Sequence, residues 1–237
     1  MGDGTGLAEA LLGLDGFRVL EVSETPGEVT VRVETTASFA GCGACGTRAV
    51  AHERMVVAVR DLACFGRPAR LVWVKRRWRC PELVCPVKSW TERSDAVDAQ
   101  VVLTRRAGAE ACRQVGAHAR PVAGVADEFG VCWATVMNAV VEHGTPLVDD
   151  PDRVGTVTQL GVDETAFLAA NRSHSTIYAT GLVDLEARIV IDMVHGNKAA
   201  DLRRWCAGAE PEWVKAIEVV ATDLAESYGT GLSPHLD

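Results

Sequence analysis

Two aspartates, sixty residues apart, each follow an apolar run that is typical of a β-strand. Asp163 follows Gln159-Leu-Gly-Val162, and Asp223 follows Ile217-Glu-Val-Val-Ala-Thr222. If these two strands lie side by side in one sheet, the two carboxylates converge on one point. Carboxylate oxygens are the ligands that Mg²⁺ and Mn²⁺ prefer, so this pair is a candidate site for metal-dependent phosphodiester chemistry.

The segments between the two aspartates predict how their strands are arranged. Two further strands are expected at 175–184 and 188–195, followed by an amphipathic helix at 198–207. This order, β-β-β-α-β, with one carboxylate on the first strand and one at the end of the fourth, resembles the layout of an RNase H-like nuclease core. We expect residues 155–237 to form a partial α/β core of this kind.

Four of the eight cysteines form two close pairs with 34 residues between them. Cys42 and Cys45 make a CxxC motif in a glycine-rich segment, and Cys80 and Cys85 make the second pair. The chain shows no secretion signal, so thiolates are expected in preference to disulfides. Two such pairs can place four sulfurs around one Zn²⁺, which predicts a structural zinc ribbon over residues 38–95. Buried structural cysteines remain an alternative, as does a redox CxxC, although no βαβ pattern follows the motif.

The basic residues of the chain are concentrated in one segment, although the net charge is −8. Residues 60–80 hold seven Lys or Arg against one acid, whereas residues 145–237 hold fifteen acids and seven bases. A basic module joined to an acidic one is typical of a DNA reader that carries a metal-binding domain. The candidate phosphate-binding residues are Arg70, Lys75, Arg76, Arg77 and Arg79. The alternative is a solvated, arginine-rich strand edge.

Residues 101–145 change to a helical pattern. A helix over 103–115 precedes a short helix, a turn at Gly130 and a second helix. This pattern is typical of a helix-turn-helix, whose second helix enters the major groove of DNA, although an ordinary helical hairpin shares it. The candidate base-reading residues on the second helix are Trp133, Thr135 and Asn138, of which asparagine can pair bidentately with adenine.

These patterns predict an α+β multidomain protein. The expected parts are a helix and hairpin at 1–37, the zinc ribbon at 38–95, the helix-turn-helix at 96–145, a linker at 146–154 and the α/β core at 155–237. No apolar run is long enough to span a membrane, and the first residues lack a signal-peptide pattern. We therefore expect a cytoplasmic, nucleoid-associated protein without a membrane partner.

With these parts in order, the chain resembles the ISL-three family of bacterial insertion-sequence transposases. The resemblance starts near Ser38 and rests on the cysteine pairs, on the helix-turn-helix pattern and on four further segments. Those segments are 60–71, 161–164, 181–186 and 222–228. It implies a DDE transposase that binds double-stranded DNA at terminal inverted repeats and cuts and joins it with Mg²⁺ or Mn²⁺. In that mechanism Asp163 would bridge two metal ions and Asp223 would bind one of them.

The chain departs from the family pattern at the third acid. The glutamate expected on a later helix has no counterpart before Asp237, which predicts a C-terminally truncated core and an incomplete, inactive catalytic centre. Two other functions therefore stay open: a non-catalytic DNA-binding repressor of transposition, and a zinc-ribbon adaptor that binds protein. The sequence also leaves a homodimer open.

Overall fold

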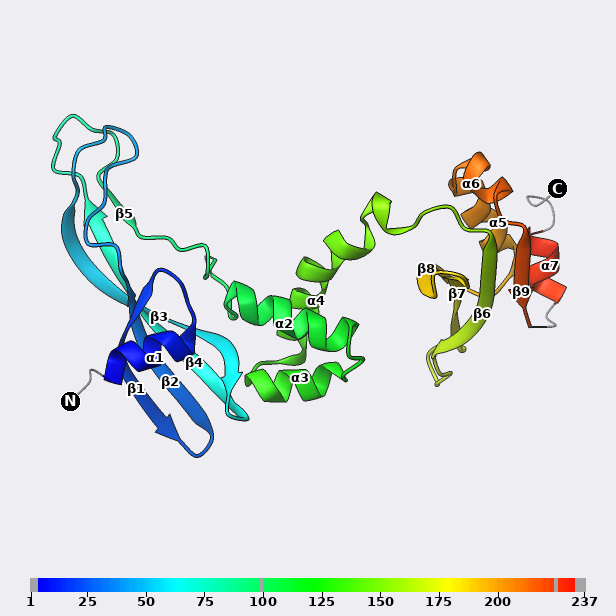
Figure 1. Cartoon of the computed structure of the whole chain (residues 1–237), viewed down its shortest axis with the longest axis horizontal. Coiled ribbons are helices and arrows are strands. Elements are labelled where there is room, and N and C mark those ends of the chain that lie inside the picture. Colours follow the sequence, from blue (N-terminus) through cyan, green and yellow to red (C-terminus); the bar gives the residue numbers. More distant parts are fainter. Residues whose placement is uncertain (1–3, 99, 224–225, 233–237) are drawn as a thin grey trace. The chain divides into compact units, whose positions relative to one another are not determined.

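The computed structural model describes residues 4–98, 100–223 and 226–232 of the chain (Figure 1). It divides into two compact units, Met1–Asp149 and Asp150–Asp237. None of the described helices has the length and apolar character that crossing a membrane requires. Each unit is described by itself below.

Unit 1 is built on a twisted sheet with the strand order β1-β2-β4-β3, to which β5 adds along β4. The β2–β4 pair is parallel, and the other pairs are antiparallel. The strands are β1 (Phe17–Thr25), β2 (Glu28–Thr35), β3 (Val50–Cys64), β4 (Arg67–Arg79) and β5 (Ser89–Thr91). A first helix, α1 (Gly4–Leu12), packs against β1 and its core through Ala8 and Leu12.

The two longest strands of this sheet, β3 and β4, form a hairpin. Its two-residue turn consists of Phe65 and Gly66, both with positive φ (53° and 75°), between the paired residues Cys64 and Arg67. Two positive φ values in succession are the geometry of a type I′ turn, whose twist matches that of the strands it joins. Apolar side chains of β1, β2 and β4 then form one core around Trp73, which is fully buried.

Three helices follow the sheet in unit 1: α2 (Arg105–Gly116), α3 (Val122–Phe129) and α4 (Trp133–Val148). The Thr104 hydroxyl caps α2 by accepting a hydrogen bond from the Ala107 N–H. Gly130 closes α3 in the left-handed region (φ 63°), as its place in the sequence predicts. The predicted linker begins too early, because α4 continues through Pro146 to Val148. Its face of Val136 and Ala139 packs on the helical core.

A buried ion pair fixes these helices to the sheet. Asp61 of β3 accepts hydrogen bonds from the Thr104 hydroxyl (2.7 Å) and the Arg106 guanidinium. Arg106 also donates to the carbonyl oxygens of Leu12 and Gly13 after α1. One side chain therefore links α1, β3 and α2, and the strand and the helices behave as one body within unit 1.

Unit 2 has a four-stranded sheet with the order β8-β7-β6-β9. β6, β7 and β8 form an antiparallel meander, and β9 returns to pair with β6 in parallel. The strands are β6 (Gln159–Leu168), β7 (Ile177–Asp184), β8 (Ile189–His195) and β9 (Val219–Thr222). The other elements are a 3₁₀ turn η1 (Pro151–Arg153) and the helices α5 (Ala199–Gly208), α6 (Pro211–Lys215) and α7 (Glu226–Leu232).

One face of this second sheet carries the core of unit 2. Leu160 and Val162 of β6 and Leu182 of β7 pack against Leu202 of α5 and Tyr228 of α7. Because side chains alternate along a strand, Gly161 and Asp163 belong to the opposite face. The first and fourth strands of the unit are thus neighbours, which is the arrangement that the two aspartates require if they are to meet.

Candidate metal centres and nucleic-acid interface

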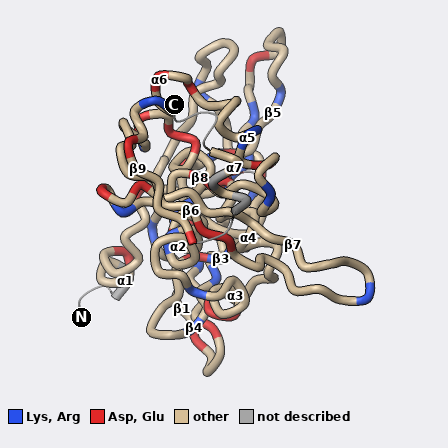
Figure 2. The backbone as a smooth tube through the Cα atoms, turned by 90° about the vertical axis from the view of Figure 1, so that its right-hand side faces the viewer, with Lys and Arg blue, Asp and Glu red and all other residues tan. Residues whose placement is uncertain are grey.

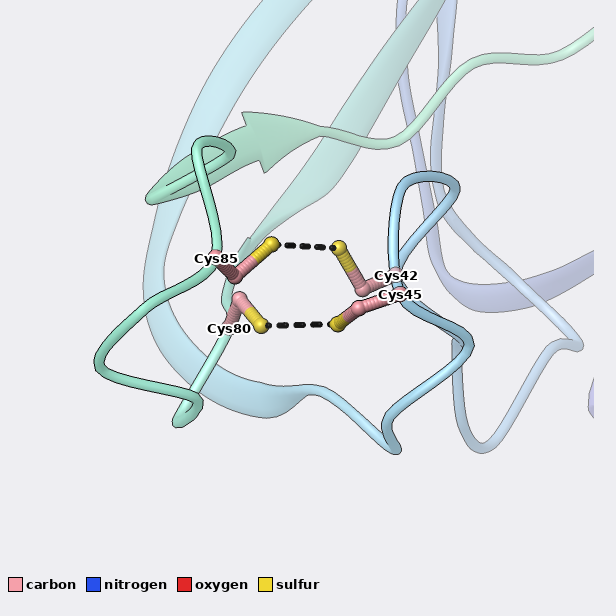
Figure 3. A group of neighbouring side chains, drawn as sticks. All are labelled: Cys42, Cys45, Cys80 and Cys85. Atoms are coloured by element: carbon pink, nitrogen blue, oxygen red, sulfur yellow. Dashed lines mark hydrogen bonds between the residues drawn. The ribbon is translucent and has the colours of Figure 1, made fainter.

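The four predicted zinc ligands come together in unit 1. Cys42 and Cys45 lie on the segment between β2 and β3, and Cys80 and Cys85 lie between β4 and β5 (Figure 3). Their sulfurs all lie within 4.8 Å of one another. Among the described residues this is the only group of three or more His, Cys, Asp or Glu side chains placed to share a metal ion.

The spacing of the sulfurs fits a zinc ion. A tetrahedral Zn²⁺ with Zn–S bonds of about 2.3 Å needs sulfurs about 3.8 Å apart. The Cys42 and Cys85 Sγ atoms are 3.7 Å apart, and those of Cys45 and Cys80 are 3.5 Å apart (Figure 3). The residues present therefore fit the metal, with all four cysteines as its ligands.

The pKa values of these thiols show why all four can become thiolates only around a positive charge. Hydrogen bonds from Thr47 lower the pKa of Cys45 to about 6. Burial raises the pKa of Cys80 to about 12, and that of Cys85 above its usual value. A divalent metal supplies the positive charge that stabilises four thiolates at one place.

Arg76 fixes the segment that leads into the first cysteine pair. This arginine is buried, and its guanidinium donates to the carbonyl oxygens of Thr35 (3.1 Å) and Ala37 and pairs with Glu34. Its backbone N–H donates to Glu92, whose other oxygen accepts from the Thr35 hydroxyl. The network joins β2, β4 and the segment after β5, and so holds the loops that carry the sulfurs.

The parallel pairing of β6 and β9 ends one residue before the two aspartates. β6 and β9 pair in parallel from Gln159↔Val219 to Val162↔Thr222. The same register, continued by one residue, pairs Asp163 with Asp223. Paired positions on adjacent strands are about 5 Å apart and share a face, and both aspartates are exposed. On this continued register, both aspartates would belong to the face opposite the core of unit 2.

Glu164, directly after Asp163, faces the core side instead. Its Oε2 atom accepts hydrogen bonds from the Asn197 amide (2.8 Å) and the Tyr228 hydroxyl (3.3 Å). Burial and then the negative charge of Glu164 raise the pKa of Tyr228 to about 12, so the phenol remains a donor. Glu164 therefore ties β6 to α7, the helix that follows Asp223.

The bases of residues 60–80 are mostly paired with acids within unit 1. Arg60 and Arg70 both contact Glu28, and their hydrogen bonds lower the pKa of Glu28 to about 2, with Arg70 as the larger cause. Arg67 pairs with Glu24, Arg76 with Glu34 and Arg77 with Glu53. Of the predicted phosphate-binding residues, Lys75 and Arg79 have no acidic partner among the residues that the structure describes.

The three predicted base-reading residues of α4 are not all on one side of the helix. Trp133 and Asn138 are exposed and Thr135 is half-buried. At 100° per residue, Thr135 and Asn138 lie about 60° apart, whereas Trp133 lies about 140° from Asn138. Thr135 and Asn138 line one cleft with Glu142 and His143. The structure brings these two together and leaves Trp133 outside the cleft.

Sequence reasoning missed two sets of residues that support the sites. The Arg76 network and the Glu164–Tyr228 hydrogen bond join residues 41 and 64 positions apart. No local spacing signals such contacts. The one usable signal for Glu164 is its place directly after Asp163, because a strand points neighbouring residues to opposite faces.

Two domains of known proteins match this chain. Residues 38–85 match a family described as the zinc-finger of transposase IS204/IS1001/IS1096/IS1165, and this range includes all four ligand cysteines. Residues 160–236 match a family described as transposase, and this range includes both aspartates. No curated protein and no solved structure matches the chain.

A zinc finger of transposases, followed by a transposase domain, defines the class of this protein as a zinc-ribbon transposase. More narrowly, both matched models are those of one family, and the chain belongs to the ISL-three transposases. The resemblance inferred from the sequence is thereby confirmed, as is the four-cysteine zinc ribbon.

Proposed function

We propose that this protein is the transposase of an insertion sequence, that it binds the terminal inverted repeats of its element, and that it takes part in metal-dependent DNA cleavage and strand transfer. The observation that supports this proposal is the parallel pairing of β6 with β9, because its register, continued by one residue, would bring Asp163 beside Asp223 within the matched transposase domain. The strand order β8-β7-β6-β9 also supports an RNase H-like core.

Asp163 and Asp223 are the proposed metal-binding carboxylates. Both offer hard oxygen ligands of the kind that Mg²⁺ and Mn²⁺ prefer. When bound, such ions activate the attacking oxygen and stabilise the leaving oxygen of an in-line displacement at phosphorus. Asp163, which also accepts a hydrogen bond from the Glu164 N–H (2.8 Å), would bridge two ions, and Asp223 would bind one. The hydrogen bond between Glu164 and Tyr228 ties β6 to α7, the helix that follows Asp223.

Unit 1 is the proposed DNA-binding part. We propose that the pair of helices α3 and α4, with the turn at Gly130, acts as a helix-turn-helix, and that Thr135 and Asn138 read bases. Trp133, Arg70, Lys75, Arg76, Arg77 and Arg79 remain predicted contact residues. The ion pairs described above favour Lys75 and Arg79 among the bases, because an arginine already held by a carboxylate gains less from a phosphate.

Duplex binding and nicking by the full chain test the catalytic proposal. Supercoiled plasmid is incubated with Mn²⁺, and duplex affinity is measured separately with an end-labelled inverted repeat. We expect Asp163→Asn to remove metal-dependent nicking while duplex affinity stays within two-fold or so of wild type. Asp192→Asn is the matched control, because Asp192 is an exposed aspartate of β8 that accepts a hydrogen bond from Trp205, and asparagine keeps that acceptor.

A second candidate function is a DNA-binding repressor of transposition without chemistry of its own. The observation that favours it is that no third acidic or histidine side chain among the described residues joins Asp163 and Asp223 in a shared site. Duplex binding by the wild type without nicking in Mn²⁺ would favour the repressor and contradict the catalytic proposal. Failure to bind duplex even at low salt would contradict both and favour a zinc-ribbon adaptor.

A further inference from the structure

An open groove runs beside the zinc site of unit 1. Its walls are the segment 37–44 before and within the first cysteine pair and the segment 87–93 around β5, and part of β4 lies between them. The groove has a volume of about 1020 Å³. Figure 2 shows basic positions on the loops beside β5.

Aromatic rings lie in this groove from both walls. Phe39 is 66% exposed. Trp90 is half-buried, pairs with Trp78 across the β4–β5 ladder and packs on the buried cysteines. An exposed ring beside a rigid metal site is a stacking surface that needs no rearrangement to receive a flat ligand.

The charge around these rings is positive. Lys75 and Arg93 line the groove, and the guanidinium of Arg48 lies 5.7 Å from the centroid of the Phe39 ring. None of these three bases has an ion-pair partner among the residues that the structure describes. The acid of the groove, Glu92, is buried, and both its oxygens accept hydrogen bonds, from the Thr35 hydroxyl and the Arg76 N–H.

The combination of rings and unpaired bases points to one class of ligand. Grooves that pair cations with exposed aromatic rings bind single-stranded nucleic acid, because the cations follow the phosphates and the rings stack on the bases. A duplex exposes only base edges in its grooves, so rings inside a concave site can stack only on bases that have left the duplex. We propose that this groove binds an unpaired segment of DNA, with phosphates on Lys75, Arg93 and Arg48 and a base stacked on Phe39.

This binding activity is separate from duplex recognition by α3 and α4. Helix α4 carries no lysine or arginine, and α3 carries none either. The proposed role of these helices is therefore to read base edges. Many of the bases of unit 1 that have no ion-pair partner among the described residues lie near the zinc site instead. The inference rests on the proposed function only in taking DNA as the ligand.

Fluorescence anisotropy with the zinc-loaded full chain tests the proposal. The probes are a labelled single-stranded oligonucleotide and the same sequence as a duplex, each titrated at several NaCl concentrations. Phe39→Ala should weaken single-strand binding about ten-fold without changing its salt dependence, since stacking involves no counterion. The double variant Lys75→Gln/Arg93→Gln should lower the slope of log K against log[salt] by about 1.4, which corresponds to two lost phosphate contacts.

Arg32→Gln is the matched control, because Arg32 is an exposed arginine of β2 in the same sheet, is not part of the groove, and has no acidic partner among the described residues. Zinc content checks that each variant is folded. If wild type binds single strands and the groove variants bind them as Arg32→Gln does, the inference is overturned and the proposed function stands. If Phe39→Ala, which removes no predicted duplex contact, loses duplex affinity as strongly as single-strand affinity, the inference is also overturned. Binding to neither probe would overturn both proposals.

Discussion

The cysteine cluster of unit 1 and the aspartate pair of unit 2 differ in how far the fold assembles them. The four sulfurs are already at zinc-binding distance. Arg76 holds the start of the first of the two cysteine loops, through Thr35 and Ala37, and the segment after the second, through Glu92. The two aspartates come together only if the register of β6 and β9 continues one residue past β9, and both are exposed. In a structural metal site the protein thus supplies every ligand of the ion, whereas a catalytic metal site leaves coordination positions open for the substrate.

The largest effect is expected from removing one sulfur. Cys80→Ser should reduce bound zinc from about one equivalent per chain to none, because three ligands leave a structural site open and metal binding is coupled to the fold of the loops. Zinc is measured by elemental analysis after gel filtration. Cys64→Ser is the control, since Cys64 lies on β3 away from the cluster. A Cys80→Ser chain that kept a full equivalent would refute the ligand set.

A smaller loss of stability is expected at the support of the zinc loops. Arg76→Lys should lower the free energy of unfolding by about 2 kcal/mol, because one ammonium group cannot reach the carbonyl oxygens of both Thr35 and Ala37. Urea denaturation of the zinc-loaded protein measures the change. Arg77→Lys, at a more exposed ion pair with Glu53, should cost about 0.5 kcal/mol or less. Equal losses of stability in the two variants would show that Arg76 contributes no more than an exposed ion pair does.

The aspartate pair should respond to the residues below it. Tyr228→Phe removes the hydroxyl that donates to Glu164 and so loosens the contact between β6 and α7. We expect Mn²⁺ affinity at the Asp163–Asp223 pair to fall about five-fold as a result. Isothermal titration calorimetry measures the affinity. Tyr178→Phe is the control, since Tyr178 is the other tyrosine of the chain. An unchanged affinity in Tyr228→Phe would argue that Glu164 has no positioning role.

The smallest effect is expected from acid titration of Glu28. Its pKa of about 2 lies below the ordinary glutamate value of 4.5, so its stabilisation is present above about pH 5 and is lost as the pH falls through 2. Glu28→Gln should therefore reduce the pH dependence of stability over this range. The urea midpoints of Glu28→Gln and of the wild type are compared at about pH 6 and at about pH 3. Zinc release at low pH affects both proteins alike, so it cancels in this comparison. An equal difference in urea midpoint at both pH values would contradict the lowered pKa of Glu28.

The sequence predicts the zinc ligands well and the arginine contacts poorly, and the reason is distance along the chain. Each cysteine pair spans at most six residues, so its geometry is local. Arg70 pairs with Glu28 of β2, and no local sequence pattern predicts that β2 pairs with β4 in parallel. The strand order around Asp163 and Asp223 follows from the β-β-β-α-β pattern, whereas the contact of Glu164 with Tyr228 depends on helix packing that periodicity does not specify.

The β3–β4 hairpin has a consequence for the order in which unit 1 folds. Cys45 and Cys80 enclose a long stretch of chain, and bringing the ends of a flexible loop together costs entropy that grows with its length. Once the hairpin has formed, Val50 is paired with Arg79, next to Cys80, and only a few residues separate Val50 from Cys45. A hairpin with a tight turn forms in microseconds. Refolding should therefore bring the sulfurs together before the metal arrives, so the rate of zinc capture during refolding should rise in proportion to zinc concentration.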